Sequence, residues 1–389
     1  MQEAAPEAPT LGILAGAGEY PMMMLKGAKR DGRRVIGVGF KGAVSKEFGE
    51  ACDEFASFRV GALEAPLRFF QQHRVTEIVM TGQLKPSCIY TMWPDATARR
   101  LLAQMDRRNA HSIFGAVCDF LKPLGITVLS STTYLEEYMP TEGPVSGPRL
   151  HDDILKQARA GMRMAREIAR LDIGQSLIVH QGKALCVEAY KGTNECIEEG
   201  GHRDFSPILC KVTKPGHDMR FDVPCVGIGT IRHCEAAGIK TIILEANKTM
   251  LLQAQQVHEL CAKAGISIHA LPYPQDDEPA PALEHEPSDD AQHARLLAAE
   301  LARLGIGTCA VVCDGVVIAV GDCEGVEKCI KRASRYMKRL RFARLSNWIC
   351  RLILGRSGAA PQPMLLASTE VLNTAQIKLA TSKGIRLVD

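Results

Sequence analysis

Short apolar runs alternate with longer amphipathic segments over the first part of the chain. The strand-like runs lie at 11–15, 34–40, 77–80 and 126–129. The segments of helical character begin at Pro21 or lie at 96–102 and 111–121. This alternation is typical of a parallel sheet with helices on its faces. The pattern predicts a first α/β domain over residues 10–145, ending in the breaker-rich stretch 141–148.

The same alternation continues in a second region. A long amphipathic segment at 151–170 begins with two aspartates, which favours a helix start there. Further strand-like runs lie at 175–180, 184–189, 208–212, 241–245 and 267–270, with a short helical segment at 194–199. We therefore predict a second α/β domain over residues 150–272. An acidic, proline-rich linker follows at 273–289.

The last hundred residues resemble part of the second domain. The segment 167–174 (EIARLDIG) matches 300–307 (ELARLGIG), and the match continues without a gap, keeping the spacing of glycines and apolar residues up to Ile330. Polar positions differ, because Gly321 and Val326 stand where the second domain has Glu188 and Thr193. Residues 290–389 are thus predicted to be a degenerate partial repeat of the second domain.

Composition narrows the class of protein. The chain has 389 residues, enough for two or three domains, and a formal net charge of +3, which gives no reason to expect a nucleic-acid partner. Its 14 cysteines include no CxxC pair, as expected of buried, reduced thiols. The sequence shows neither a signal peptide nor an apolar run long enough to cross a bilayer. We expect a cytoplasmic protein, or at most one that is peripheral on the inner face of the cytoplasmic membrane.

One basic segment bears on the membrane question. Residues 332–356 place apolar side chains at intervals of three to five residues between arginines and lysines. Such a helix can lie on an anionic membrane surface. The alternative is that its apolar stripe packs on the sheet of the repeat and the arginines are solvated.

The turn Gly16-Ala17-Gly18 lies between the first predicted strand and helix. Backbone amides of such a turn can approach a phosphate at the helix N-terminus, although a plain tight turn explains the glycines equally well. A dinucleotide site of the usual kind is disfavoured. The third glycine of that motif is missing, and the second strand is followed by Lys41 instead of an acidic residue.

The richest chemistry lies between two prolines at 215 and 224. Two cations, a histidine and two carboxylates fall in or beside this short loop: Lys214, His217, Asp218, Arg220 and Asp222. Cations can neutralise phosphate oxygens while carboxylates hold Mg²⁺ or orient water. In extended backbone the alternate residues 218, 220 and 222 share one side. The alternative is a solvated loop with surface ion pairs.

Glu188 and Thr193 lie at a predicted strand end and helix start in the second domain. Their simplest interpretation is the capping of a helix N-terminus.

Several segments, in this order, resemble one family. They are LGILAGAGEYP at 11–21, LDIGQ at 171–175, VEAYKGT at 187–193 and above all KVTKPGHDMRFDVP at 211–224. These segments look like the LpxI-type UDP-2,3-diacylglucosamine pyrophosphatases of lipid A synthesis. The resemblance covers residues 10–272 and implies a Rossmann-like N-terminal domain, a second α/β domain and a substrate held between them. It also implies Mg²⁺-dependent hydrolysis of the sugar nucleotide to UMP and 2,3-diacylglucosamine 1-phosphate.

The resemblance further implies roles for individual residues. Asp218 and Asp222 would bind Mg²⁺ and activate water, and Lys214 and Arg220 would stabilise charge on the diphosphate. His217, which replaces the usual glutamine, would complete the catalytic set. Substrate contacts would come from Gly16, Ala17, Gly18, Gln83, Lys85, Gln175, Glu188 and Thr193. The expected partner is a lipid-bearing UDP-sugar, and a homodimer is compatible with the sequence. The alternative is a non-catalytic regulatory protein that binds a sugar nucleotide or lipid and in which the third module has become the working part.

Overall fold

The computed structural model describes most of the chain. It covers residues 10–83, 94–104, 110–190, 192–202, 204–221, 223–272, 289–313, 315–321, 325–335 and 364–388. Contacts between the described residues divide the chain into two compact units. The first contains the residues up to Glu137 together with Asp218–Val223, and the second contains the described residues from Tyr138 onward apart from that segment.

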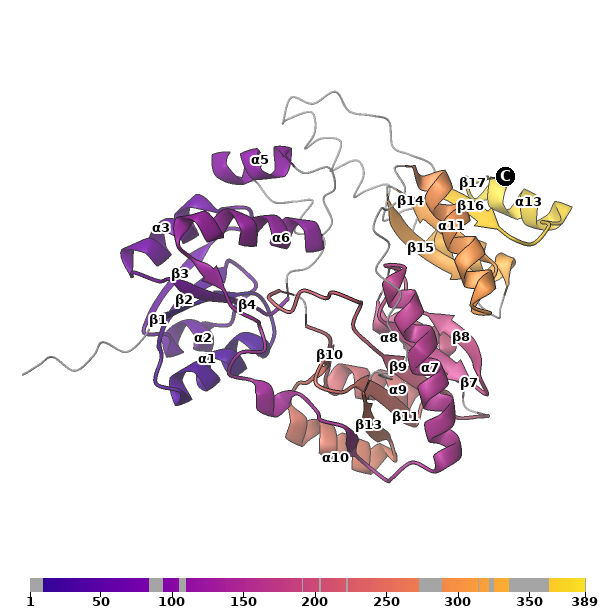
Figure 1. Cartoon of the computed structure of the whole chain (residues 1–389), viewed down its shortest axis with the longest axis horizontal. Helices are drawn as coiled ribbons and strands as arrows, with labels where there is room; N and C mark the ends of the chain where they lie inside the picture. The colour runs from indigo at the N-terminus through magenta and orange to yellow at the C-terminus, as the bar shows by residue number, and fades with distance from the viewer. Residues whose placement is uncertain are drawn as a thin grey trace, which may run out of the picture. The chain divides into compact units, whose positions relative to one another are not determined.

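The first unit is built on a five-stranded parallel sheet of order β3-β2-β1-β4-β5 (Figure 1). Its strands are β1 (Thr10–Ala15), β2 (Arg34–Phe40), β3 (Glu54–Phe58), β4 (Glu77–Thr81) and β5 (Thr127–Val128). Its α-helices are α1 (Tyr20–Arg30), α2 (Lys46–Ala51), α3 (Glu64–Gln72), α5 (Ala96–Ala103) and α6 (Ala110–Leu121). Two 3₁₀ turns lie at Lys122–Leu124 and Glu136–Tyr138. The central strands are buried on both faces, which explains their continuous apolar sequences.

The second unit contains a mixed six-stranded sheet of order β6-β13-β11-β9-β7-β8. The strands are β6 (Gly143–Ser146), β7 (Ser176–His180), β8 (Lys183–Val187), β9 (Ile208–Lys211), β11 (Thr241–Glu245) and β13 (Ser267–Leu271). The helices are α7 (Asp152–Arg170), α8 (Thr193–Gly200), α9 (Ile228–Ala237) and α10 (Ala254–Ala264). A small parallel pair joins β10 (Cys225–Val226) and β12 (Met250–Leu251). Strands β9, β11 and β13 run parallel, so their carboxyl ends lie at one edge of the sheet.

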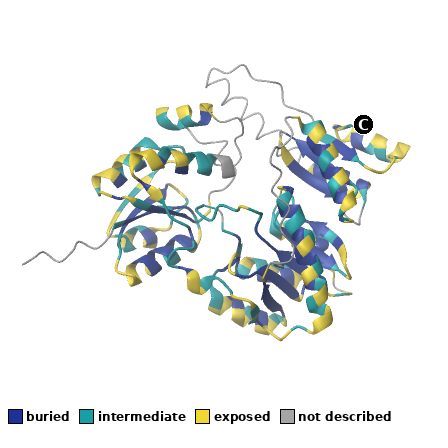
Figure 2. Cartoon of the chain, viewed as in Figure 1, coloured by how far each residue is buried: buried dark blue, intermediate teal, exposed yellow. Residues whose placement is uncertain are grey.

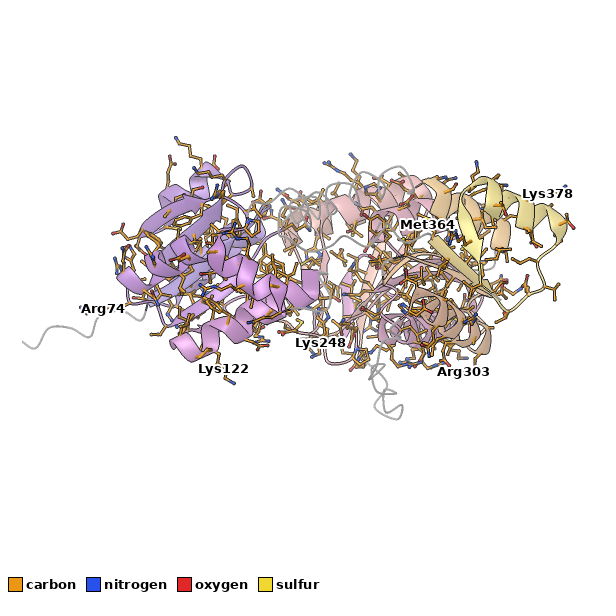
Figure 3. All side chains as sticks on the ribbon, turned by 90° about the horizontal axis from the view of Figure 1, so that it is seen from above. Arg74, Lys122, Lys248, Arg303, Met364 and Lys378 are labelled. Carbon is orange, nitrogen blue, oxygen red and sulfur yellow. The ribbon has the colours of Figure 1, made fainter. Side chains whose placement is uncertain are left out.

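A further four-stranded sheet of order β15-β14-β16-β17 completes the second unit. Its strands are β14 (Cys309–Cys313), β15 (Val316–Gly321), β16 (Met364–Ser368) and β17 (Ile385–Leu387). Helices α11 (Asp290–Arg303) and α13 (Thr374–Ser382) accompany it, and residues 326–335 are also helical. Met364, labelled in Figure 3, begins β16 and is buried in this part of the core.

The core of the second unit runs without a break from the second sheet into this last sheet. Buried residues of α7 and β7 belong to the same apolar cluster as buried residues of α11 and β14. Figure 2 shows the strands as predominantly buried and the outward faces of the helices as exposed. The described residues from 290 onward therefore share a core with the second domain instead of forming a separate body.

The predicted α/β class is confirmed. The strands that were not predicted from the sequence are β3, β6, β10, β12, β16 and β17. Strand β3 lies at the edge of the first sheet, and β6 lies in the glycine- and proline-rich stretch expected to be only a domain exit. Among the described helices none is long and apolar enough to cross a membrane. Of the basic segment 332–356, only residues 332–335 lie within the described part of the chain.

Candidate functional site

The first sheet has a topological switch point at its carboxyl edge, where the order in which strands are added reverses. Strands β2 and β3 lie on one side of β1, and β4 and β5 lie on the other. In open parallel sheets ligands bind at such a reversal, beyond the carboxyl ends of the strands. The turn 16–18 follows β1 there, and Gln83 follows β4. The fold thus brings the predicted glycine turn and Gln83 together.

Backbone contacts explain the first glycine of this turn. Ala17 and Gln83 exchange two backbone hydrogen bonds of 2.8 and 2.9 Å, and the amide of Gly16 donates to the carbonyl of Thr81 at 2.8 Å. A Cβ atom on Gly16 would lie 2.7 Å from the carbonyl oxygen of Gln83. Gly16 is therefore required by the close approach of two chain segments. Gly18 is exposed, with φ of +95°, and precedes a helix whose N-cap residue, Glu19, makes no side-chain hydrogen bond to it.

Part of the charged loop belongs to the first unit. The carbonyl of Met219 accepts a hydrogen bond from the amide of Ser131 at 2.8 Å, and the Ser131 hydroxyl donates to the carbonyl of Arg220 at 2.6 Å. The ring of Phe221 stacks on Phe114, with centroids 5.7 Å apart and planes at 23°. Ser131 follows β5, so residues 219–221 are attached beyond the carboxyl end of that strand. The sequence had placed the whole loop in the second domain.

Asp218 and Arg220 form a bidentate ion pair. Arg220 Nη2 lies 2.6 Å from Asp218 Oδ2, and Nε lies 2.9 Å from Oδ1. Hydrogen bonds to the Asp218 carboxylate raise the pKa of Arg220. The two side chains meet because the amide of Arg220 donates to Asp218 Oδ1 at 3.1 Å within a turn. Residues 218–220 thus turn locally, and it is this turn, not an extended backbone, that brings the two side chains together.

The other predicted residues of the loop lie in the second unit. Lys214 Nζ lies 3.0 Å from Asp172 Oδ1, and the amide of His217 donates to the carbonyl of Lys214 at 3.2 Å. The loop residues described in the structure are therefore divided, with Lys214 and His217 in one unit and Asp218 and Arg220 in the other. Asp222, like Lys85 in the first domain, lies outside the described residues.

A buried lysine organises the polar residues at the edge of the second sheet. Lys211 ends β9 and is 8% exposed, and its ammonium donates to Thr193 Oγ1 at 2.8 Å and to Ser176 Oγ at 3.4 Å. Thr193 in turn donates to Glu188 Oε1 at 3.1 Å. The backbone amide of Gln175 donates to Glu188 Oε2 at 3.3 Å. The structure thus brings Gln175, Glu188 and Thr193 together around a cation that the sequence prediction did not single out.

Thr193 and Glu188 do more than cap a helix. Thr193 is the first residue of α8, while the N-cap, Gly192, has φ of +82° and no side chain to offer. The Thr193 hydroxyl bonds a lysine and a glutamate, so its hydrogen bonds connect three chain segments. The capping interpretation is therefore insufficient for these two residues.

A second buried charge cluster adjoins the start of the loop. Glu245 ends β11 and is 3% exposed; its carboxylate accepts hydrogen bonds from the amide and the hydroxyl of Thr213, both at 2.8 Å. Arg166 of α7 lies 3.0 Å from the other carboxylate oxygen and also donates to the carbonyl of Thr213 at 2.6 Å. These contacts fix the backbone immediately before Lys214. A charged residue ending an otherwise apolar strand was the only sequence signal for Glu245 and Lys211.

The described residues alone do not make a complete magnesium site. They contain no group of three or more His, Cys, Asp or Glu side chains arranged to hold a metal ion. Both oxygens of Asp218 are engaged by Arg220. A site of the kind expected from the sequence would need Asp222 as well.

Comparisons with known proteins agree with the resemblance noted in the sequence. The pattern of the LpxI N-terminal domain matches residues 10–138, and that of the LpxI C-terminal domain matches residues 141–269 and 280–347. A protein of Caulobacter vibrioides named UDP-2,3-diacylglucosamine pyrophosphatase LpxI is 23% identical over 262 residues, covering 64% of this chain and 92% of the relative.

Two solved structures that match this chain are only remotely similar to it. Biotin carboxylase from Campylobacter jejuni matches with a TM-score of 0.20 and 10% identity, over 59% of this chain and 42% of that one. The biotin carboxylase domain of a thermophilic 2-oxoglutarate carboxylase matches with a TM-score of 0.20 and 11% identity, over 49% and 32% of the two chains. Such scores carry no argument about this fold. With both of its domains matched in order over most of the described chain, the protein belongs to the LpxI family.

Proposed function

We propose that the protein hydrolyses the diphosphate of UDP-2,3-diacylglucosamine, releasing UMP and 2,3-diacylglucosamine 1-phosphate. The observation that carries this proposal is membership of the LpxI family through both domains. The name of the Caulobacter relative, which is matched over 92% of its length, supports the same substrate. A lipid-bearing UDP-sugar is thus the expected partner.

The chain's cations suit a substrate with two phosphates. Arg220 presents a planar guanidinium that Asp218 holds in a fixed orientation, which lowers the entropy lost when the group binds an anion. Lys214 and Lys211 are two further cations on the second unit. Preorganised cations stabilise the charge that develops on phosphate oxygens as water attacks phosphorus. We assign charge stabilisation to Arg220 and Lys214, and assign to Lys211 the positioning of Thr193.

We assign the orientation of water and a share of Mg²⁺ binding to Asp222, with Asp218 as its neighbour. Mg²⁺, where bound, would neutralise negative charge on the diphosphate. Since Asp218 is committed to Arg220, its oxygens can serve a metal only as shared ligands. His217 remains a proposed catalytic residue beside them. Gln83 and Lys85 remain proposed contacts to the substrate, as do the 16–18 turn and the polar cluster around Lys211.

The direct test is to incubate the purified chain with UDP-2,3-diacylglucosamine and to measure UMP with Mg²⁺ and after chelation. We expect UMP to form with Mg²⁺ and to fall to background after EDTA treatment, returning when Mg²⁺ is restored. A chain that binds the substrate but releases no UMP would overturn the proposed activity. Release that is insensitive to EDTA would overturn the metal assignment alone.

Lys211→Met tests the positioning role. Methionine keeps the length and apolar stem of the side chain but cannot donate to Thr193. We expect UMP release to fall by on the order of 10-fold or more, the scale of losing a charge-assisted hydrogen bond. Lys183→Met, at an exposed position that begins β8, is the matched control and should leave the rate unchanged.

We also infer that residues 290–389 are a degenerate partial copy of the second domain. The match of the LpxI C-terminal domain to residues 280–347 as well as to 141–269 supports this inference. The copy lacks the polar cluster, because Cys309, Gly321 and Val326 stand at the positions of Ser176, Glu188 and Thr193. We assign the copy no part in the chemistry.

A further inference from the structure

The last sheet repeats the strand pairing of one half of the second sheet. In both, an antiparallel hairpin is flanked by an antiparallel strand, which is followed by a parallel one: β8-β7-β9-β11 and β15-β14-β16-β17. Each hairpin has one irregularity, between Ile178 and Val179 in the first and between Val311 and Val312 in the second. These two sites are equivalent in the ungapped sequence match that pairs residue 167 with residue 300.

Backbone conformations recur at equivalent positions of the same match. Three positions before, within and after the first hairpin have positive φ: Asp172 (55°), Gly182 (76°) and Gly192 (82°). Their counterparts are Gly305 (64°), Gly315 (75°) and Gly325 (80°). Positive φ is uncommon and is set by local geometry, so agreement at three positions indicates the same local fold.

The two halves share one buried core that is built from equivalent positions. Several pairs of residues that the ungapped match makes equivalent have both members in this single cluster. They are Ala165 and Ala298, Ile168 and Leu301, Ile173 and Ile306, Leu177 and Ala310, Val179 and Val312, Ala184 and Val317, and Val187 and Val320. The same face of each half therefore contributes to the core, as in the isologous interface of a symmetric dimer.

Ion pairs between the halves follow the same symmetry. Arg170 pairs with Glu167 of its own helix at 2.9 Å and with Glu300, the counterpart of Glu167, at 3.1 Å. In the other half Arg303 pairs with Glu300 at 2.9 Å. The pKa of Arg303 is raised mainly by Glu300 and, to a smaller extent, by the charge of Glu167. The labelled side chain of Arg303 in Figure 3 marks this end of α11.

One further ion pair joins two residues at equivalent positions of the two halves, as expected of a contact on a twofold axis. Glu199 Oε2 is 2.6 Å from Arg332 Nε, with side chains 19% and 9% exposed. Extending the ungapped match by two positions beyond Ile330 makes residues 199 and 332 each other's counterparts. A residue on a twofold axis meets its own copy, so two identical halves would bring a glutamate against a glutamate. The arginine at 332 replaces that repulsion with an ion pair.

We propose that the C-terminal module is a built-in second subunit for the second domain. It packs about a pseudo-twofold axis on the face that an identical copy would otherwise cover. The Glu199–Arg332 pair makes the contact specific for the module over a second copy of the domain, since like charges across an interface disfavour the wrong partner. This face of the second domain is consequently closed to other chains.

The test uses the full chain with a protease site placed after Glu278 in the acidic linker. The purified protein is cleaved while folded, and the two pieces are followed by size exclusion with light scattering. We expect the pieces to remain together with the mass of one chain. Separation of the wild-type pieces would overturn the proposal. A mass of two chains that persists on dilution, and that is lost when residues of this face are changed, would also overturn it.

Charge reversal tests the axis itself. Glu199→Arg places an arginine against Arg332 and Arg335, and Arg332→Glu places a glutamate against Glu199. These like charges should each weaken the association of the cleaved pieces by on the order of 10²-fold. The double variant Glu199→Arg/Arg332→Glu re-forms the pair with reversed sign and should recover most of the association. The control, Lys331→Glu, changes an exposed residue that pairs within its own helix and should have no effect. A double variant as weak as the single ones would refute the pairing even if the single variants fold poorly.

Discussion

The buried cluster of Glu245, Arg166 and Thr213 permits a prediction with a worked magnitude. In Glu245→Gln the amide oxygen can still accept from Thr213, but the guanidinium of Arg166 loses its counter-charge while only 12% exposed. Removing one partner of a buried ion pair costs about 3–5 kcal/mol, and we expect the lower end because one acceptor survives. For a unit of this size each kcal/mol lowers the Tm by about 2–4 °C, so the loss is roughly 6–12 °C.

A thermodynamic cycle separates the charge from the shape of the side chain. Arg166→Met removes the charge that Glu245→Gln leaves unpaired, so the double variant should recover at least about 2 kcal/mol relative to the sum of the two single variants. Glu259→Gln, at an exposed position on α10, should stay within about 0.5 kcal/mol of wild type. Chemical denaturation followed by circular dichroism measures all four proteins. A Glu245→Gln variant as stable as the Glu259→Gln control would refute the assignment of a buried ion pair.

Three further predictions concern other parts of the chain. Asp222→Ala should lower the rate of UMP release by on the order of 10²-fold or more with little change in Tm. The control is Asp314→Ala, in the C-terminal module, which lacks the charged loop. A fully active Asp222→Ala variant would refute the catalytic role of Asp222. Gly16→Ala should destabilise the first unit by about 1–3 kcal/mol in denaturant unfolding, because the added methyl would meet the Gln83 backbone at 2.7 Å, and an unchanged midpoint would contradict this close approach. Burial, and to a smaller extent the charge of Arg149, lowers the pKa of His269. The stability that the neutral imidazole allows is therefore fully present above the unfolded-state pKa of about 6.5, and it declines as the pH falls through that value. Loss of stability between about pH 7 and pH 5.5 should be smaller in His269→Gln, and equal slopes would assign the pH dependence to other groups.

The central strands of the first two sheets were predictable, whereas β3 and β6, each at an edge of one of these sheets, were not. Central strands such as β1, β2 and β11 are continuous apolar runs, because helices or neighbouring elements cover both of their faces. In β3 most residues are half-buried or exposed, so its sequence carries less of this signal. Strand β6 contains Pro144 and pairs with β13 at the end of the sheet, where a strand tolerates a residue that cannot donate a hydrogen bond.

The sequence identified the segment that carries the candidate site, but it did not predict how the side chains are arranged there. The density of charges at 214–222 pointed to the loop. The turn that joins Asp218 to Arg220 and the division of the loop between two units depend on contacts with residues such as Ser131, nearly ninety positions earlier in the chain. Arg166 is one of several arginines on α7, and only the packing of α7 against β9 and β11 shows that it meets Glu245.

The polar cluster around Lys211 also bears on our inference that the C-terminal module is a degenerate copy of the second domain. Four side chains of this cluster bond one another: Lys211, Ser176, Thr193 and Glu188. The loss of any one leaves buried polar groups without partners, which is costly in a core. In the module Val326 and Cys309 are buried within an apolar cluster, and a Cβ atom on Gly321 would lie 2.3 Å from Cys309 Sγ. A glutamate at position 321, the counterpart of Glu188, would have to displace that cysteine, so the apolar core of the module leaves no room for the polar cluster of the second domain.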